Sequence, residues 1–454
     1  MEEGSARSFR SLTDSIGSFQ IEDQTLLIPQ MNRTSCFLLA GVFRSFGMKA
    51  EVMDTYEALD LGKAFTSGKE CFPCQVTLGD ILHHMQKEQE RLGPRFDPGN
   101  YIYFMPEAGG PCRFGMYNKY QRIVLDSMPG LEKLKIASLT TNDGYSLDGM
   151  IDEDRVTHFR KIAFLSIIVA DILDRVLWRI RPYEKEKGLA DDFVEKSMFL
   201  MADLFEEYGA GKEQEKILIQ LDKVVQEAAG LIDPAIPRKP LVGVVGEIYL
   251  RCHTQSNQNI LRLLEKYGAE VVNASIGEWM NFISYTRKRE AGIGIRLDLR
   301  QLRINRLKSY IKKMIEQGLN LYYQQMKMDK IYERVLKYID IAGDHDVRHM
   351  DEKLIQSDLF SFDVGTEACL SISGIMEYID GGFNGVVNVY PFTCMPSTIT
   401  SAVIKPLVNQ LKVPYLDTAY DGTFQPGREA AIRTFMYQVQ QHFNNNHRKE
   451  TNKQ

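Results

Sequence analysis

The alternation of strand and helix patterns is the feature that most limits how this chain can fold. Short apolar runs at 24–30, 49–55, 101–106 and 133–141 are separated by stretches with helical spacing. Strands joined by helices in this way pair in parallel, because each crossover brings the chain back to the same end of the sheet. The pattern predicts an N-terminal α/β domain over residues 23–150.

The pattern changes twice after this domain. Residues 151–236 read as a helical segment, which ends in the proline-rich stretch "LIDPAIPRKP". Strand and helix patterns then alternate again over 237–444, with a helical insertion from 276 to about 341. We therefore expect an α/β fold with two Rossmann-like domains, each with a mostly parallel sheet, joined by a helical segment. Residues 1–22 are predicted to be a flexible tail and 445–454 a polar tail.

Composition argues against several classes of partner. The net charge is −5, with acidic and basic residues interspersed, so no basic face for nucleic acid is predicted. No run of about 18 apolar residues is present, which predicts no membrane span. The first twenty residues do not have the layout of a signal peptide, so we expect a cytoplasmic protein. In a reducing compartment the seven cysteines do not form a disulfide framework.

Four of these cysteines fall where ligands bind in parallel sheets, beyond the carboxyl ends of strands. Cys71 and Cys74 form a CxxC in a turn that opens a helix, in "GKECFPC". Cys112 follows the third strand pattern, and Cys394 follows the strand pattern at 385–392. Helix N-termini present N–H groups that stabilise thiolates and cluster sulfides.

The spacing alone leaves three interpretations of these thiols open. They could bind a metal or cluster, form a redox dithiol, or be plain structural cysteines. One CxxC with two distant single cysteines matches neither a zinc ribbon nor the compact ferredoxin run. Other polar candidates are weaker: the histidines are interpreted as solvated helix residues, and two turn residues could contact a ligand. These are His83, His84, His345, His349, Asp421 and Thr423.

The cysteine motifs as a set resemble a known family. "TSGKECFPCQVTLGD", "GGPCRFGMYN" and "VVNVYPFTCMPSTI" are similar to motifs of the 2-hydroxyacyl-CoA dehydratase superfamily. Within it they resemble the uncharacterised branch that is associated with the ATP-dependent activase of the CoA enzymes. The resemblance runs from about Leu27 to Phe443, with the motifs in the family order.

The resemblance implies a [4Fe-4S] cluster held between two Rossmann-like domains. By position, Cys71, Cys112 and Cys394 match the family's cysteines, and Cys74 completes the CxxC of the branch. Cys36, at the start of the first helix, is a fifth candidate, and five or six ligands would suit a double-cubane cluster. Of the remaining two, Cys369 is interpreted as a core residue, and Cys252 follows a strand without a recognisable motif.

The family's activity implies an ATP-dependent activase partner that injects a low-potential electron, followed by dehydration of an acyl-CoA or reduction of a small molecule. No CoA-binding set is identified in this chain, so whether it is itself an enzyme is left open. The alternatives are a non-enzymatic electron-transfer or scaffold subunit, and an α/β protein with zinc or structural thiols. Assembly as a homodimer or heterodimer is also left open. Arg113, beside Cys112, could offset cluster charge, guide the partner or form a surface ion pair.

Overall fold

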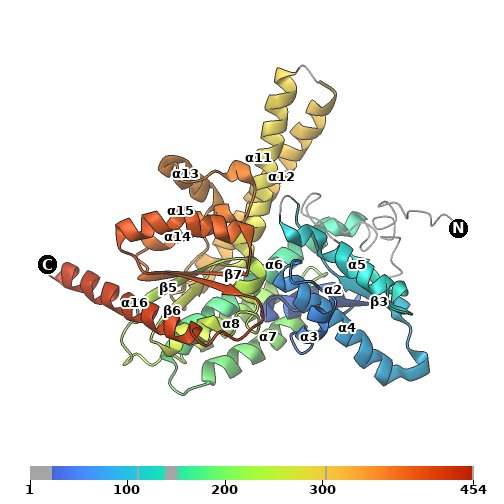
Figure 1. Cartoon of the computed structure of the whole chain (residues 1–454), viewed down its shortest axis with the longest axis horizontal. Coiled ribbons are helices and arrows are strands. Elements are labelled where there is room, and N and C mark those ends of the chain that lie inside the picture. The colour runs from blue at the N-terminus through green and yellow to red at the C-terminus, as the bar shows by residue number, and fades with distance from the viewer. Residues whose placement is uncertain (1–22, 110–111, 139–150, 152, 302–303, 452–454) are drawn as a thin grey trace.

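The computed structural model describes residues 23–109, 112–138, 151, 153–301 and 304–451 (Figure 1). The predicted flexible tail, 1–22, lies outside the described residues. Two parallel sheets with helices packed on them account for most of the molecule, which confirms the predicted α/β class. In the part of the chain that the structure describes, no helix combines the length and apolarity needed to cross a membrane.

The N-terminal sheet has four strands in the order β2-β1-β3-β4, and every neighbouring pair is parallel. Its strands are β1 (Thr25–Ile28), β2 (Lys49–Val52), β3 (Tyr101–Phe104) and β4 (Lys135–Ala137). All four lie inside the predicted runs. From β1, the chain adds β2 on one side of the sheet and β3 on the other, so the strand order changes direction between β1 and β3. In open α/β sheets, ligands bind at this switch point, beyond the carboxyl ends of the strands.

Helices cover both faces of this sheet. Alternate strand residues point to opposite faces, so Leu26 belongs to one core and Leu27 to another. The Leu26 face is covered by α2 (Arg33–Ser45), α6 (Glu153–Ile180), α7 (Leu189–Tyr208) and α8 (Glu215–Ala229). The Leu27 face is covered by α4 (Phe72–Leu92) and α5 (Tyr117–Asp126), with the short α3 (Leu59–Ala64) against α4. The helical segment 151–236 therefore shares the core on this side of the N-terminal sheet, and α6 also contacts the strand Glu270–Asn273 of the other sheet.

The C-terminal sheet repeats the arrangement, with four parallel strands in the order β6-β5-β7-β8. Its strands are β5 (Leu241–Gly246), β6 (Glu270–Asn273), β7 (Gly385–Pro391) and β8 (Tyr415–Tyr420). Its helices are α9 (Ile248–Cys252), α10 (Ile260–Lys266), α14 (Ala368–Asp380), α15 (Met395–Leu411) and α16 (Arg428–Thr451). The last helix extends into the predicted polar tail.

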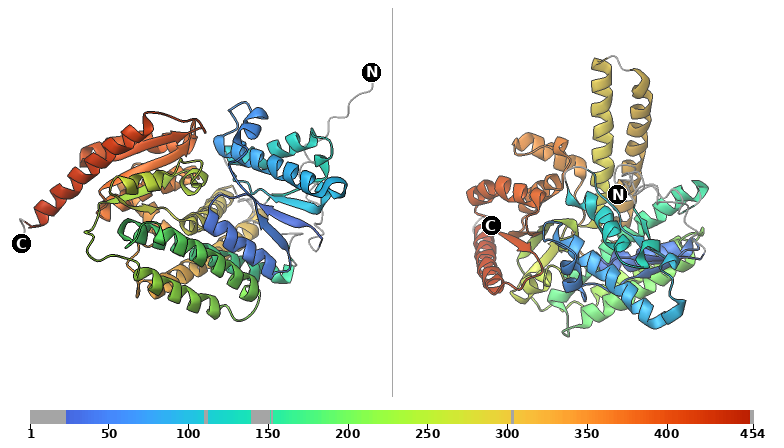
Figure 2. Two further views of the ribbon diagram at one scale, coloured as in Figure 1. Left: turned by 90° about the horizontal axis from the view of Figure 1, so that it is seen from below. Right: turned by 45° about the vertical axis from the view of Figure 1, so that its right-hand side comes forward.

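Three helices are inserted between β6 and α14, where the sequence predicts helical material. They are α11 (Ile276–Arg300), α12 (Ile304–Val335) and α13 (Val347–Ser357). The first two form a long hairpin that stands out from the body of the molecule (Figures 1 and 2). At its base, Asp171 of α6 accepts hydrogen bonds from the Ile276 and Gly277 amides, at 3.1 and 2.8 Å. The helical segment is thus joined to the insertion.

Candidate functional site

The three cysteine loops lie at the carboxyl ends of strands or at the start of a helix. Cys71 immediately precedes α4. Cys112 comes after β3, before the 3₁₀ turn at Arg113–Met116, and Cys394 comes after β7, before α15. The loop cysteines therefore belong to both sheets, as the sequence predicts.

Arg113 connects these loops directly. Its Nη1 donates to the Lys69 carbonyl at 2.8 Å, two residues before Cys71. Its Nη2 donates to the Thr393 carbonyl at 3.0 Å, one residue before Cys394. Because Arg113 itself follows Cys112, one side chain holds the loops of three of the predicted cysteines together. Both partners are backbone carbonyls, so Arg113 forms a bridge between loops rather than the surface ion pair that the sequence also allowed.

Two residues of these loops have unusual backbone conformations. Cys71 has φ 99° and ψ 143°, and Thr393 has φ 65°. Residues other than glycine pay a steric cost at positive φ, and such strain is concentrated at functional sites. Both strained residues lie beside or within the cysteine motifs.

Electrostatic interactions also link the thiols in two pairs. Cys71 acts on Cys74 within the CxxC, and the Cys394 thiol acts on Cys112. Burial raises the pKa of Cys71 to about 11, although a hydrogen bond from the Tyr117 hydroxyl opposes the shift. Burial likewise raises the pKa of Cys394 to about 12, and it raises the pKa values of Cys74 and Cys112. A reactive redox dithiol needs a lowered pKa, so these protonated, buried thiols do not favour that interpretation.

Two carboxylates near the thiols were not identified from the sequence. Glu247 comes directly after β5 and accepts hydrogen bonds from the Tyr249 and Leu250 amides, at 3.1 and 3.0 Å. Its charge raises the pKa values of Cys71, Cys112 and Cys394. Glu367, just before α14, has its pKa raised to about 8 by burial and by Glu247. The signal for Glu247 was its position after a strand, the same rule that selected the cysteines.

Cys36 is not brought to this group. It packs in the core on the Leu26 face of the N-terminal sheet, whereas Cys71 and Cys74 pack in the core on the Leu27 face. Its thiol lies 3.6 Å from the Pro29 carbonyl. The separation follows from the crossovers, because α2 and α4 cover opposite faces of the sheet.

The remaining two cysteines have other surroundings. Cys369 is fully buried in the core around α14, and its thiol lies 3.4 Å from the Ser361 carbonyl. Cys252 lines a cavity of about 310 Å³ between α2, α7 and the segment after α9.

The other polar candidates have protein partners. His345 and His349 face Glu278 and Glu377, and His83 faces Glu57. The ring of His84 packs edge-on against Tyr101. Thr423 donates from its amide and its hydroxyl to Asp421, which closes an exposed turn.

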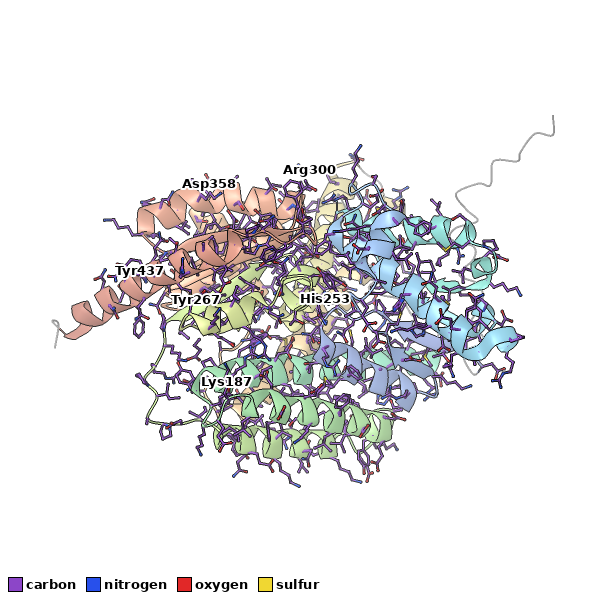
Figure 3. The ribbon with its side chains drawn as sticks, turned by 60° about the horizontal axis from the view of Figure 1, so that its bottom comes forward. Lys187, His253, Tyr267, Arg300, Asp358 and Tyr437 are labelled. Atoms are coloured by element: carbon purple, nitrogen blue, oxygen red, sulfur yellow. The ribbon has the colours of Figure 1, made fainter. Side chains whose placement is uncertain are left out.

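A buried polar chain crosses from one sheet domain to the other beside the site. The Thr55 hydroxyl lies 2.6 Å from Asp80 and 3.1 Å from the His253 ring, and the other ring nitrogen of His253 lies 2.6 Å from Ser256. Figure 3 shows His253 between the two parts of the molecule. These hydrogen bonds help to fix the position of one sheet domain against the other.

No three or more His, Cys, Asp or Glu side chains among the described residues are arranged to hold a single metal ion. An iron–sulfur cluster sets a different requirement, because each thiolate binds a different iron and the thiolates stand farther apart than the ligands of one ion. The donor set fits such a group in its chemistry: four thiols from three loops, held together by Arg113.

The fold and site define a class: a protein with two parallel-sheet α/β domains whose strand-end loops direct thiols to the boundary between them. Neither the family models nor the curated proteins with which the chain was compared gave a match.

Proposed function

We propose that this chain is an iron–sulfur protein of the 2-hydroxyacyl-CoA dehydratase type. Cys71, Cys74, Cys112 and Cys394 would hold a [4Fe-4S] cluster at the boundary between the two sheet domains. The cluster would receive low-potential electrons from an ATP-dependent activase and pass them to a reductive or dehydratase reaction. We place this chemistry in the cytoplasm.

The observation that carries the proposal is the bridge from Arg113 to the Lys69 and Thr393 carbonyls. It brings the Cys71, Cys112 and Cys394 motifs to one place, although Arg113 and Thr393 are 280 residues apart in the chain. A shared inorganic centre explains why thiols from both domains converge there. When ionised, the buried Glu247 adds negative charge near the thiols, which disfavours reduction of a cluster and lowers its potential.

The number of thiols favours a second candidate function, that of a non-enzymatic electron-transfer subunit. Four cysteine ligands occupy all four irons of one cubane, which leaves no open iron for a substrate. Three ligands, with Cys74 as a bystander, would leave one iron open for chemistry. The double-cubane form would need further ligands, and Cys36 lies in another core.

Anaerobic purification or reconstitution tests the proposal. We expect about four irons and four sulfides per chain, and an EPR signal after reduction. Cys112→Ser and Cys394→Ser should each lose most of the iron, while Cys252→Ser, which removes a thiol outside the group, should keep it. Zinc in place of iron, or full iron loading in either of the first two variants, would refute the assignment.

The two candidate functions are separated by turnover. With an added ATP-dependent activase and ATP, an enzyme should reduce or dehydrate a small substrate, whereas an electron carrier should only become reduced. Cys74→Ser is informative here: an electron carrier should lose its cluster, but an enzyme with three ligands should keep it.

A further inference from the structure

The helical hairpin carries a continuous apolar stripe that the other described residues leave exposed. Five side chains of α12 form it, with exposed fractions between 39% and 70%: Ile311, Ile315, Leu319, Tyr322 and Met326. Their spacing of four, four, three and four residues places them on one side of the helix. Hydrophobic residues at this spacing are typical of a helix that packs against another helix along its length.

The stripe faces away from the partner helix within the hairpin. The side of α12 that packs against α11 carries the buried Gln317 and Leu321. By helical rotation, the stripe lies more than a third of a turn away from that side. Figures 1 and 2 show the hairpin standing clear of both sheet domains.

Charged residues of opposite sign lie at the two ends of the stripe. Lys308 and Lys312 are exposed at its N-terminal end, and Asp329 and Glu333, with Lys330 between them, are exposed at its C-terminal end, so the two ends have net charges of opposite sign. A surface for an acidic or basic partner would carry one sign of charge along its length. A stripe with opposite signs at its ends is complementary to a copy of itself that runs the other way.

We infer that α12 is an interface between two copies of this chain, packed antiparallel about a two-fold axis. In one register, with the axis between Asn320 and Leu321, four of the five stripe residues face one another and Ile311 faces the second copy's Lys330. In that register Leu319 faces the second copy's Tyr322, and Ile315 faces the second copy's Met326. At the two ends, the charged residues pair in the same register: Lys312 faces the second copy's Asp329, and Lys308 faces the second copy's Glu333.

The size of this interface sets its expected strength. The sixteen residues from Ile311 to Met326 span about 22 Å of helix. A seam of this length buries less than about 1,200 Å² in total, a size typical of weak or transient association. The flanking charges then mainly determine the orientation and the choice of partner.

Sedimentation equilibrium on the full chain tests this inference, over protein concentrations from about 1 to 100 μM. We expect a reversible monomer–dimer equilibrium. Leu319→Lys combined with Tyr322→Lys should weaken the dimer at least tenfold. Ile355→Lys provides the matched control, because Ile355 is as exposed, at 62%, but lies on α13. A wild-type chain that remains monomeric at the highest concentration would refute the inference.

Charge exchange tests the antiparallel register. One variant carries Lys308→Glu and Lys312→Glu, and the other carries Asp329→Lys and Glu333→Lys. Each alone should dimerise more weakly than wild type, since like charges then meet at both ends. An equimolar mixture should restore the dimer, because each end then pairs opposite charges. If the mixture dimerises no more strongly than the separate variants, this register is excluded. If the chain stays monomeric but binds a different protein, and the stripe variants lose that binding, the stripe has another occupant.

Discussion

Arg113 and Thr393 join the two sheet domains: Nη2 of the arginine donates to the threonine carbonyl at 3.0 Å, from one cysteine loop to another. Thr393 holds a positive φ of 65°. The same guanidinium reaches the Lys69 carbonyl. This one side chain therefore links the three loops that carry Cys71, Cys112 and Cys394.

We predict that Arg113→Ala loosens the site without unfolding the chain. It removes two hydrogen bonds from a charged donor, so the free energy of unfolding of the metal-free protein should fall by about 1–3 kcal/mol. A chelator should also extract iron from the loaded protein faster. Thermal denaturation and the rate of iron loss measure the two effects.

Arg113→Lys separates the charge from the bridge. Lysine keeps the positive charge, but its single ammonium lacks the planar fork that reaches two carbonyls. We expect Arg113→Lys to fall between the wild type and Arg113→Ala, both in the free energy of unfolding and in the rate of iron loss. Arg91→Ala is the control, since Arg91 is exposed and pairs with Glu88 three residues earlier on the same helix. If Arg113→Lys behaves as wild type, the charge and not the bridge is what matters.

The close approach of α3 to α4 gives a second prediction. A Cβ added at Gly62 would lie 1.9 Å from the Gln75 carbonyl oxygen, and one at Gly79 would lie 2.3 Å from the Ala58 carbonyl oxygen. Gly62→Ala should therefore force the two helices apart and lower the free energy of unfolding by about 1–3 kcal/mol or more. Chemical denaturation measures the loss. Because α4 begins just after Cys71, the CxxC should also become more exposed to thiol reagents.

Gly292→Ala is the matched control for this prediction. It lies inside α11, and an added Cβ there meets nothing within 4 Å. Alanine is favoured over glycine in a helix by about 1 kcal/mol, so this variant should be neutral or slightly more stable. Equal destabilisation by both changes would show that the contact between α3 and α4 is not the cause.

The eight strands of the described residues could be predicted because parallel sheets leave short buried runs of β-forming residues, such as Leu241–Gly246, between helical patterns. The convergence of Cys112 and Cys394 followed from the position of strand ends. Cys36 could not be separated from Cys71 in this way, because both begin helices and only the crossover direction puts them on different faces. Glu247 was missed because a single carboxylate after a strand is also common in loops that have no functional role. The arm formed by α11 and α12 has helical periodicity, but periodicity does not tell a projecting hairpin from a packed one.

Asp80 gives a prediction on pH. It is buried at 3% exposure and accepts hydrogen bonds from the Thr55 hydroxyl and the Tyr56 amide, at 2.6 and 2.8 Å. Burial outweighs these bonds and raises its pKa from 3.8 to about 7. Between these values the folded state binds a proton that the unfolded state has released, so Asp80 makes the protein less stable as pH rises.

Asp80→Asn should remove this contribution while keeping the shape of the side chain. Relative to the variant, the wild type should lose up to about 1.4 kcal/mol of stability for each pH unit between about 4 and 7. Urea unfolding at a series of pH values measures the difference. Asp60→Asn, an exposed position on α3, is the control and should show no such trend. A difference between wild type and Asp80→Asn that stays constant with pH would contradict the assignment.

The last prediction concerns the ion pair between Arg175 of α6 and Asp344, in the loop after α12. Both side chains are almost fully buried, at 4% and 5% exposure, and Arg175 also donates to the Gly343 carbonyl at 3.0 Å. Arg175→Met leaves Asp344 buried without its cation, which should cost about 3–5 kcal/mol of unfolding free energy. Arg33→Met is the contrast, because Arg33 and Glu195 form an exposed pair, and its loss should cost at most about 1 kcal/mol.

A double-mutant cycle shows whether the pair itself is responsible. Adding Asp344→Asn to Arg175→Met removes the stranded charge, so the double variant should be more stable than the sum of the two single changes predicts. Equilibrium denaturation of the four proteins gives the coupling energy. Strictly additive effects would mean that Arg175 stabilises the chain through its carbonyl contacts alone. Because Arg175 lies on α6 and Asp344 lies in the loop after α12, a large coupling would show that this buried pair stabilises the contact between the helical segment and the insertion.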